Sequence, residues 1–307
     1  MNTLISHGFI LKLKKIMTKV TFGFIVGGDD AYYNNLMRAC ESLERVKQDH
    51  EILIIDMDDR LSIDQPNVKI VKVDAEELQN EGDDRNYFQP YIWKERYNLY
   101  KYVETDYCFY MDTDTVVIND RVDELIEEAG HKFLCTQHWW VPTLKDYFAT
   151  GKIDKTNMGP YLPWDPGEYD YIASGAFMFQ KDKHDGLFSK YDEIFREVFS
   201  DGKLHSGVTD ELILCFALNE CMQFMENING ETNGFYHLTN GSFNHCAANT
   251  QQPLELRDGV WYGSNPQDDE MKPIFLFHSA AENVATLGRY GTDGEELKKV
   301  MYWEDYK

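Results

Sequence analysis

The chain has 307 residues, of which 43% are hydrophobic, and it carries a formal net charge of −23. This length is sufficient for one large core, and we expect a single α/β domain. The acidic residues are spread along the chain, so the surrounding field repels polyanions. We therefore exclude nucleic acid and anionic membrane surfaces as partners.

We expect residues 1–16 to be a loose extension and residues 17–307 to form the domain. The apolar patch of the extension precedes its lysines, unlike a signal peptide, and it is too short to span a bilayer. No later run is long enough for a transmembrane segment. The six cysteines include no CxxC pair, and several lie within apolar runs. These features favour a cytoplasmic protein.

The first half alternates between short apolar runs and helical patterns, which predicts an α/β fold. Strands are expected over Val20–Val26, Glu51–Asp56 and Val68–Val73. The helix after the first strand has apolar residues at i, i+3, i+4 and i+7, namely Leu36, Ala39, Cys40 and Leu43. A second helix over Trp93–Val103 leads into the apolar stretch "CFYMDTDTVVI", Cys108–Ile118.

The second half is harder to interpret. Residues 119–170 are predicted to be irregular and aromatic, with "QHWWVP" and "YLPWDPGEYDYI" resembling binding loops. A strand at Gly175–Gln180 is followed by an amphipathic helix, a second helix beginning at Asp210 and a late strand, "PIFLFH". The loop setting of Trp139, Trp140 and Trp164 favours stacking on an acceptor sugar, although the three could also be core residues.

Asp112 and Asp114 follow an apolar run typical of a strand buried on both faces of a parallel sheet. In open α/β sheets, ligands bind beyond the carboxyl ends of the strands. Paired carboxylates at such a position suit Mg²⁺ or Mn²⁺. The spacing alone is weak support, because a second triplet stands at Asp56–Asp58 and a solvated turn would also explain it.

Two chemistries use this triplet after a strand. One is a phosphatase of the haloacid dehalogenase type, in which Asp112 would attack phosphorus and whose pattern DxDx[TV] matches "DTDTV". The other is a nucleotide-sugar glycosyltransferase, in which the pair holds a metal ion on the donor diphosphate. A non-catalytic carbohydrate-binding protein on the same scaffold is a third possibility. A sugar nucleotidyltransferase is disfavoured, because the loop "GGDDAYY" after the first strand is acidic.

Further motifs favour the glycosyltransferase. They are "FIVGGDDAYYNNLMRACESL", a basic residue on the helix before the triplet, "ASGAFMFQ", "TDELIL" and "IFLFHSAAEN". With these motifs the chain resembles glycosyltransferases of family 8, the glycogenin and bacterial lipopolysaccharide galactosyltransferase group, from Val20 to about Asn219 and again near His278. The resemblance implies a GT-A fold, with a Rossmann-like, mostly parallel sheet, flanking helices and an aromatic acceptor-side region.

The resemblance also implies an activity and a set of site residues. The activity is the metal-dependent transfer of a hexose from a UDP-sugar to an acceptor hydroxyl, with retention of configuration. The implied metal ligands are Asp112, Asp114 and His278, and the catalytic acids are Asp210 and Glu211. The donor-binding residues would be Val26, Asp30, Tyr32, Arg96, Thr113, Ser174, Gly175 and Arg289.

The sequence departs from the family pattern at several positions. Ala173 replaces an asparagine that would contact the donor sugar, Glu211 replaces a glutamine, and the closing HxxGxxKPW motif is absent. Simpler explanations also exist for single residues. Asp210 and Glu211 could be first-turn acids stabilised by a helix dipole, and Arg96 could form a surface salt bridge. Tyr32 could simply pack the first helix.

Overall fold

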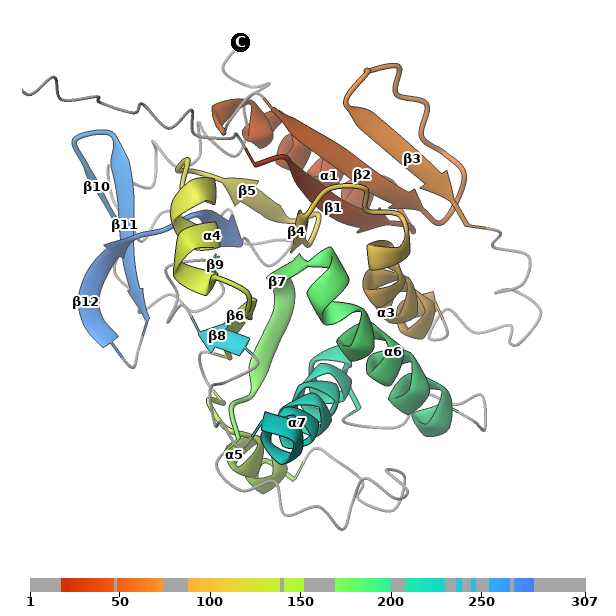
Figure 1. Ribbon diagram of the computed structural model, residues 1–307. Coiled ribbons are helices and arrows are strands. Elements are labelled where there is room, and N and C mark those ends of the chain that lie inside the picture. The colour runs from red at the N-terminus through yellow and green to blue at the C-terminus, as the bar shows by residue number, and fades with distance from the viewer. Residues whose placement is uncertain are drawn as a thin grey trace, which may run out of the picture.

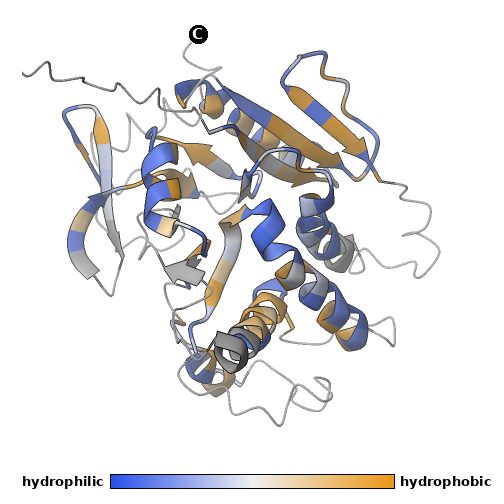
Figure 2. Ribbon diagram, in the orientation of Figure 1, coloured by the Kyte–Doolittle hydropathy of each residue, from blue (hydrophilic) through white to orange (hydrophobic). Residues whose placement is uncertain are grey.

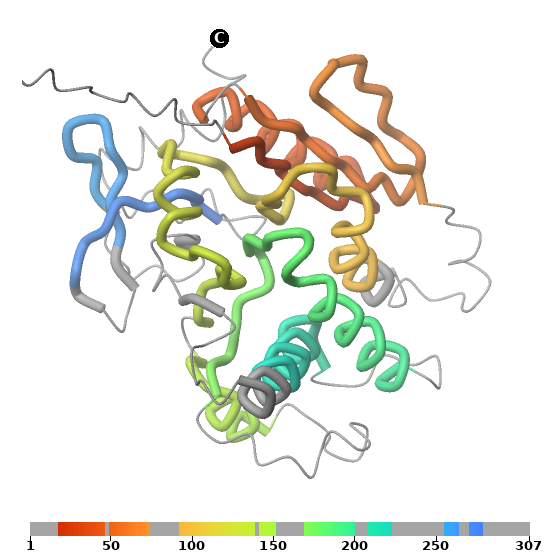
Figure 3. Tube along the Cα trace, viewed as in Figure 1, coloured from red at the N-terminus to blue at the C-terminus, as the bar shows by residue number. Residues whose placement is uncertain are grey.

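The computed structural model describes residues 18–46, 49–73, 88–138, 141–151, 169–199, 208–229, 236–238, 244–246, 254–265 and 268–278. The coloured trace in Figure 3 follows the chain through these elements. The expected extension over residues 1–16 lies outside the described residues. Within the described part, none of the helices is both long enough and apolar enough to cross a membrane.

A seven-stranded, mostly parallel sheet forms the centre of the molecule (Figure 1). Its strand order is β3-β2-β1-β4-β7-β6-β8. Neighbouring strands pair in parallel except for β7, which is antiparallel to β4 and β6. The strands are β1 (Val20–Val26), β2 (His50–Asp56), β3 (Val68–Lys72), β4 (Tyr107–Met111), β6 (Phe133–Gln137), β7 (Ile172–Gln180) and β8 (Tyr236–Leu238). The predicted α/β fold with a mostly parallel sheet is confirmed.

Helices cover both faces of this sheet. They are α1 (Asp30–Ser42), α3 (Phe88–Asn98), α4 (Val122–Ala129), α5 (Leu144–Ala149), α6 (Lys181–Val198) and α7 (Asp210–Asn229), with 3₁₀ turns η1 (Leu43–Arg45) and η3 (Leu99–Lys101). Side chains of α1 and α4 share one core cluster, and those of α3, α5, α6 and α7 share the other. Figures 1 and 3 show α6 and α7 side by side.

The two core clusters explain why the central strands are continuously apolar. On β4, Cys108 and Tyr110 belong to one cluster, whereas Phe109 and Met111 belong to the other. Successive side chains of a strand point to opposite faces, so a strand covered on both sides needs apolar residues at every position. The hydrophobic colouring of the central strands in Figure 2 follows this requirement.

Two small sheets complete the described fold. One has the order β10-β11-β12, formed by β10 (Leu254–Arg257), β11 (Val260–Asn265) and β12 (Asp268–Pro273). The other has the order β5-β13-β9, formed by β5 (Thr115–Val117), β13 (Leu276–His278) and β9 (Asn244–Cys246). Because β13 is antiparallel to β5, His278 lies opposite Thr115, directly after the carboxylate pair. The predicted late strand is thus confirmed.

The expectation that residues 119–170 are irregular is wrong. This stretch contains α4, β6 and α5. In α4, Val122, Leu125 and Ala129 are buried at i, i+3 and i+7, which is the pattern of an amphipathic helix. The sequence contains this apolar pattern, but the pattern covers only eight residues within an aromatic, Pro-containing region.

Asn119 joins the β10-β11-β12 sheet to the main body. Its Nδ2 donates to the backbone oxygens of Trp261, at 2.9 Å, and of Ile274, and its Oδ1 accepts from the Trp261 backbone N–H at 3.1 Å. Replacing it by alanine leaves these part-buried backbone groups without this partner. We predict that Asn119→Ala lowers the free energy of unfolding by about 1–3 kcal/mol, measured by urea denaturation. The exposed Asn34→Ala is the control, and an equally small effect of both variants would contradict the proposed role of Asn119.

Candidate active site

The carboxylate pair lies in a tight turn between β4 and β5, at the carboxyl end of β4. The backbone N–H and the hydroxyl of Thr115 both donate to the Asp112 backbone oxygen, at 3.2 and 2.6 Å. The turn directs Asp112 and Asp114 toward His278 at the end of β13. One ligand atom from each of the three lies within 4.8 Å of the others. His278 Nε2 is 3.0 Å from Asp114 Oδ1.

The absence of a side chain at Gly175 makes room for this cluster. A Cβ there would lie 2.5 Å from His278 Cε1 and 3.0 Å from Asp112 Oδ2. The other carboxylate oxygen, Asp112 Oδ1, accepts from the Tyr110 hydroxyl at 2.6 Å and from Arg96 at 3.0 Å. Oδ2 therefore faces the imidazole across Gly175. Two carboxylates and an imidazole in this arrangement fit a divalent cation such as Mn²⁺ or Mg²⁺.

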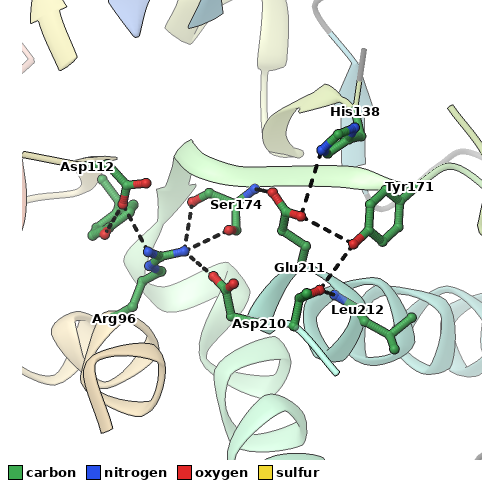
Figure 4. Close-up of polar contacts among 10 residues, drawn as sticks. Arg96, Asp112, His138, Tyr171, Ser174, Asp210, Glu211 and Leu212 are labelled. Carbon is green, nitrogen blue, oxygen red and sulfur yellow. Dashed lines mark hydrogen bonds and ion pairs between the residues drawn. The ribbon is translucent and has the colours of Figure 1, made fainter. Parts of the chain in front are cut away.

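Arg96 is the buried cation of the site (Figure 4). Besides Asp112, its guanidinium donates to the Ser174 hydroxyl at 2.7 Å and forms an ion pair with Asp210. Burial alone would lower the pKa of Arg96, but the two carboxylates outweigh it and hold this pKa well above its usual value. The interpretation of Arg96 as a surface salt bridge is wrong, because only 8% of the residue is exposed.

Glu211 lies on the other side of Ser174 (Figure 4). Its Oε1 accepts from the Ser174 backbone N–H at 3.4 Å, and its Oε2 accepts from the Tyr171 hydroxyl at 3.2 Å. The Nε2 atom of His138 is 3.9 Å from the same oxygen. Burial, followed by the negative charge of Asp210, raises the pKa of Glu211 to about 8. The carboxyl is therefore mostly protonated at neutral pH and becomes ionised as the pH rises through about 8.

The two acids at the start of α7 are more than partners of the helix dipole. The helix has its own cap, because the Thr209 hydroxyl accepts from the Leu212 backbone N–H at 3.1 Å. Asp210 is engaged by Arg96, and Glu211 is held by Ser174 and Tyr171. Both carboxylates therefore have specific partners on other elements.

The predicted donor-binding residues near the first strand lie at its carboxyl end. Val26 ends β1 and is buried. Asp30 is exposed at the start of α1 and pairs with Arg60. Tyr32 is 49% exposed, whereas its neighbour Tyr33 is buried and packs α1. The idea that Tyr32 packs the helix is therefore wrong, and its ring is open to a ligand.

Other predicted residues have mixed outcomes. Thr113 is buried between the two aspartates. Trp139, Trp140, Trp164 and Arg289 lie outside the described residues.

Two residues next to Glu211, Tyr171 and His138, were not identified from the sequence. They stand in the aromatic loops "YLPWDPGEYDYI" and "QHWWVP", but no spacing distinguishes them from their neighbours.

The fold is similar to that of the galactosyltransferase LgtC, solved in complex with donor and acceptor sugar analogues. The TM-score is 0.54 at 16% identity, and the match covers 92% of this chain and 95% of that chain. An active-site mutant of LgtC with glutamate in place of glutamine matches over the same shares, with a TM-score of 0.53 at 15% identity. The glycosyltransferase GlyE in Streptococcus pneumoniae TIGR4 has a TM-score of 0.39 at 16% identity over 66% of this chain and 44% of that chain, which is too low to support an argument.

No protein-family model and no curated protein sequence matches the chain. At such low identity, the similarity to LgtC establishes the fold and does not by itself assign an activity. The chain therefore has the GT-A fold of the galactosyltransferase LgtC, which confirms the predicted fold class and supports the resemblance to family 8 glycosyltransferases at the level of the fold.

Proposed function

We propose that the protein is a metal-dependent glycosyltransferase that moves a hexose from a UDP-sugar to an acceptor hydroxyl with retention of configuration. The observation that carries the proposal is the convergence of Asp112, Asp114 and His278 beside Arg96, on a scaffold shared with LgtC. Two carboxylates and an imidazole, all of them side chains that can bind a metal ion, thus lie next to a guanidinium, a cation that commonly binds phosphate groups. The group lies at the carboxyl edge of the sheet. LgtC itself was solved with donor and acceptor sugar analogues.

In this proposal, each residue of the site has a defined task. Asp112, Asp114 and His278 hold Mn²⁺ or Mg²⁺, which when bound supplies positive charge for the departing diphosphate. Arg96 contributes further positive charge there and orients Asp112. Tyr32 stacks on the base. Asp210 holds Arg96 in place.

Glu211 faces the anomeric carbon and stabilises the positive charge that develops there. Its carboxylate could also attack that carbon, forming a bond from Oε to the sugar while the bond to the diphosphate breaks and its electron pair leaves with UDP. The acceptor oxygen would then displace Glu211, whose carboxylate takes back the electron pair of the broken bond, and the hydroxyl proton would pass to an oxygen of the departing UDP diphosphate. The family resemblance places Glu211 where a glutamine is usual, and the LgtC mutant carries the same glutamine-to-glutamate change at an active-site position.

The two alternatives make different demands on the site. A phosphatase needs Asp112 as a nucleophile, yet one of its oxygens already binds Tyr110 and Arg96, and the scaffold is that of a glycosyltransferase. A non-catalytic carbohydrate-binding protein would share the fold and the metal cluster. Turnover separates this alternative from the proposed enzyme.

The first test is a thermal-shift panel of UDP, GDP, CMP and inorganic phosphate, each with Mn²⁺ or with EDTA, followed by hydrolysis assays of UDP-hexoses. A ligand that binds only the native state raises the melting temperature by mass action. We expect a Mn²⁺-dependent rise with UDP and release of UDP from at least one UDP-hexose. A larger rise with GDP would exclude the proposed donor, and hydrolysis of p-nitrophenyl phosphate would favour the phosphatase. Binding without turnover would favour the carbohydrate-binding protein.

The second test addresses the metal ligands. Asp114→Asn should weaken Mn²⁺ binding at least tenfold, because a neutral amide is a poorer ligand than a carboxylate. Electron paramagnetic resonance of free Mn²⁺ measures this directly, without donor or turnover. Asp120→Asn, an exposed residue just beyond β5, removes the same charge and serves as the control. If the two variants bind Mn²⁺ equally well, Asp114 is not a ligand.

The third test concerns Glu211. Glu211→Gln should leave the UDP-dependent thermal shift unchanged and lower kcat by about 10² to 10³, the scale for removing one preorganised electrostatic partner. An unchanged kcat would remove Glu211 from the catalytic machinery.

The pH dependence of stability gives this variant an independent control. The pKa of Glu211 is raised on folding, so its protonated form favours the folded state. This stabilising contribution is complete below the unfolded value of about 4.3 and is lost as the pH rises through about 8. Raising the pH to 9 should therefore destabilise the wild type relative to Glu211→Gln. If Glu211 were only a first-turn acid stabilised by the helix dipole, its ionised form would favour the folded state. The wild type would then be more stable than Glu211→Gln at pH 9, by about 0.3–1 kcal/mol.

A further inference from the structure

Tyr171 is held rigidly beside the Glu211 carboxyl. Its ring is 1% exposed and stacks on Tyr147, with centroids 4.6 Å apart and planes 12° apart. Its backbone is fixed on both sides, since its N–H donates to the Pro142 oxygen at 2.9 Å and its oxygen accepts from the His138 N–H at 2.6 Å. The hydroxyl position is therefore set by packing and backbone bonds rather than by Glu211.

The Tyr171 hydroxyl lies among the side-chain oxygens of Thr209, Tyr147 and Glu211. Thr209 Oγ1 accepts from the Leu212 N–H as the cap of α7 and lies 3.1 Å from the Tyr171 hydroxyl oxygen. The Tyr171 hydroxyl donates to Glu211 Oε2 at 3.2 Å, because an ionised carboxylate can only accept. Burial, and then the charge of Glu211, raise the pKa of Tyr171 far above its usual value. The phenol thus remains a donor across the working pH range.

This arrangement suits an ionised carboxylate. Oε2 receives the Tyr171 hydroxyl, and Oε1 receives the Ser174 N–H. An ionised carboxylate accepts hydrogen bonds at both oxygens, whereas a protonated one must place its own proton and gains less from these donors. A donor that favours the ionised form counteracts the burial and the neighbouring charge that favour protonation.

We propose that Tyr171 is a positioning residue for Glu211: its hydroxyl orients the carboxylate toward the donor sugar and favours the ionised form that the reaction uses. This inference rests on the proposed function, because it assumes that Glu211 faces the anomeric carbon. It goes beyond that function because it names a residue, outside the metal and donor sites, that affects the pH range in which the enzyme is active. The mutual placement of β7, α5 and the start of α7 positions this residue.

Several other groups face Glu211 and have to be considered in any pH dependence. They are Asp210 and Cys215 on α7, Arg96 on α3, Tyr147 on α5 and His138 in the segment after β6. His138 is itself a titratable group next to Glu211 Oε2, so a kinetic pH profile alone cannot be assigned to the carboxyl. The experiment needs a signal that belongs to the carboxyl.

Tyr171→Phe is the variant of choice, because it keeps the stacked ring and removes only the hydroxyl. Infrared pH titration without donor follows the carboxylic acid C=O band of Glu211, which is identified by its absence in Glu211→Gln. We expect its midpoint to rise by about 1 pH unit, the equivalent of one lost hydrogen bond to a charged group. The kcat for donor hydrolysis at pH 7 should fall about tenfold, recover as the pH is raised above the new midpoint, and leave the KM of the donor unchanged.

Tyr100→Phe is the matched control, because Tyr100 also stacks on another ring, Phe188, and lies outside the site. It should change neither the midpoint nor kcat. In Tyr171→Phe, an unmoved midpoint, or a loss of kcat by the same factor at every pH, would overturn the positioning role while leaving the proposed function intact. If the wild type turns over no UDP-hexose, the proposed function fails, and the catalytic purpose assigned to Tyr171 fails with it even where the midpoint moves.

Discussion

A buried guanidinium held between two carboxylates is the interaction on which the candidate site depends. Arg96 from α3 binds Asp112 after β4, Ser174 on β7 and Asp210 at the start of α7. A cation removed from water must be paired, and breaking such a buried pair typically costs about 3–5 kcal/mol. Two helices and two strands are therefore fixed relative to one another at the point where the candidate ligands converge. The site and the fold share this contact, so variants of Arg96 cannot separate a catalytic role from a structural one.

In the part of the site that the structure describes, four carboxyl groups and one guanidinium meet. Asp112 and Asp210 bind the Arg96 guanidinium, whereas Asp114 lies beside Asp112 and Glu211 beside Asp210. The imidazoles of His278 and His138 are next to Asp114 and Glu211, respectively. Burial raises the pKa of Asp112, and the charge of Asp114 adds to this effect even though Arg96 opposes it. Burial and the negative charge of Asp210 likewise raise the pKa of Glu211. A divalent cation between Asp112 and Asp114 would relieve the repulsion on one side. On the other side, the Ser174 N–H, the charge of Arg96 and the Tyr171 hydroxyl partly compensate the Glu211 carboxylate.

Short-range patterns in the sequence predicted five of the seven strands of the central sheet and the carboxylate pair Asp112 and Asp114, but they did not predict β6 or β8. Buried strands appear as continuous apolar runs, and Asp112 and Asp114 follow one of them directly. His278 was reached only through the family resemblance, since its approach to Asp114 depends on the pairing of strands more than 150 residues apart in sequence. Tyr171 and His138 could not be identified. Their contacts with Glu211 arise from three separate elements, and an aromatic-rich loop gives no spacing that singles out one ring.

The two Asp-x-Asp triplets show why spacing alone does not define a metal site. Both follow central strands of the same sheet, β2 and β4. Asp56 is fully buried, and its oxygens accept from the Tyr33 hydroxyl at 2.7 Å and from the Leu61 N–H at 2.7 Å, while Asp58 accepts from the Gly28 N–H at 2.7 Å. These carboxylates stabilise the loops after β1 and β2, because their oxygens already accept from two backbone N–H groups and from the Tyr33 hydroxyl. At the second triplet, by contrast, Gly175 leaves space in front of Asp112 Oδ2 and β13 brings an imidazole to Asp114. What the surrounding elements present to the oxygens, rather than the order of the residues, distinguishes a candidate metal ligand from a structural acid.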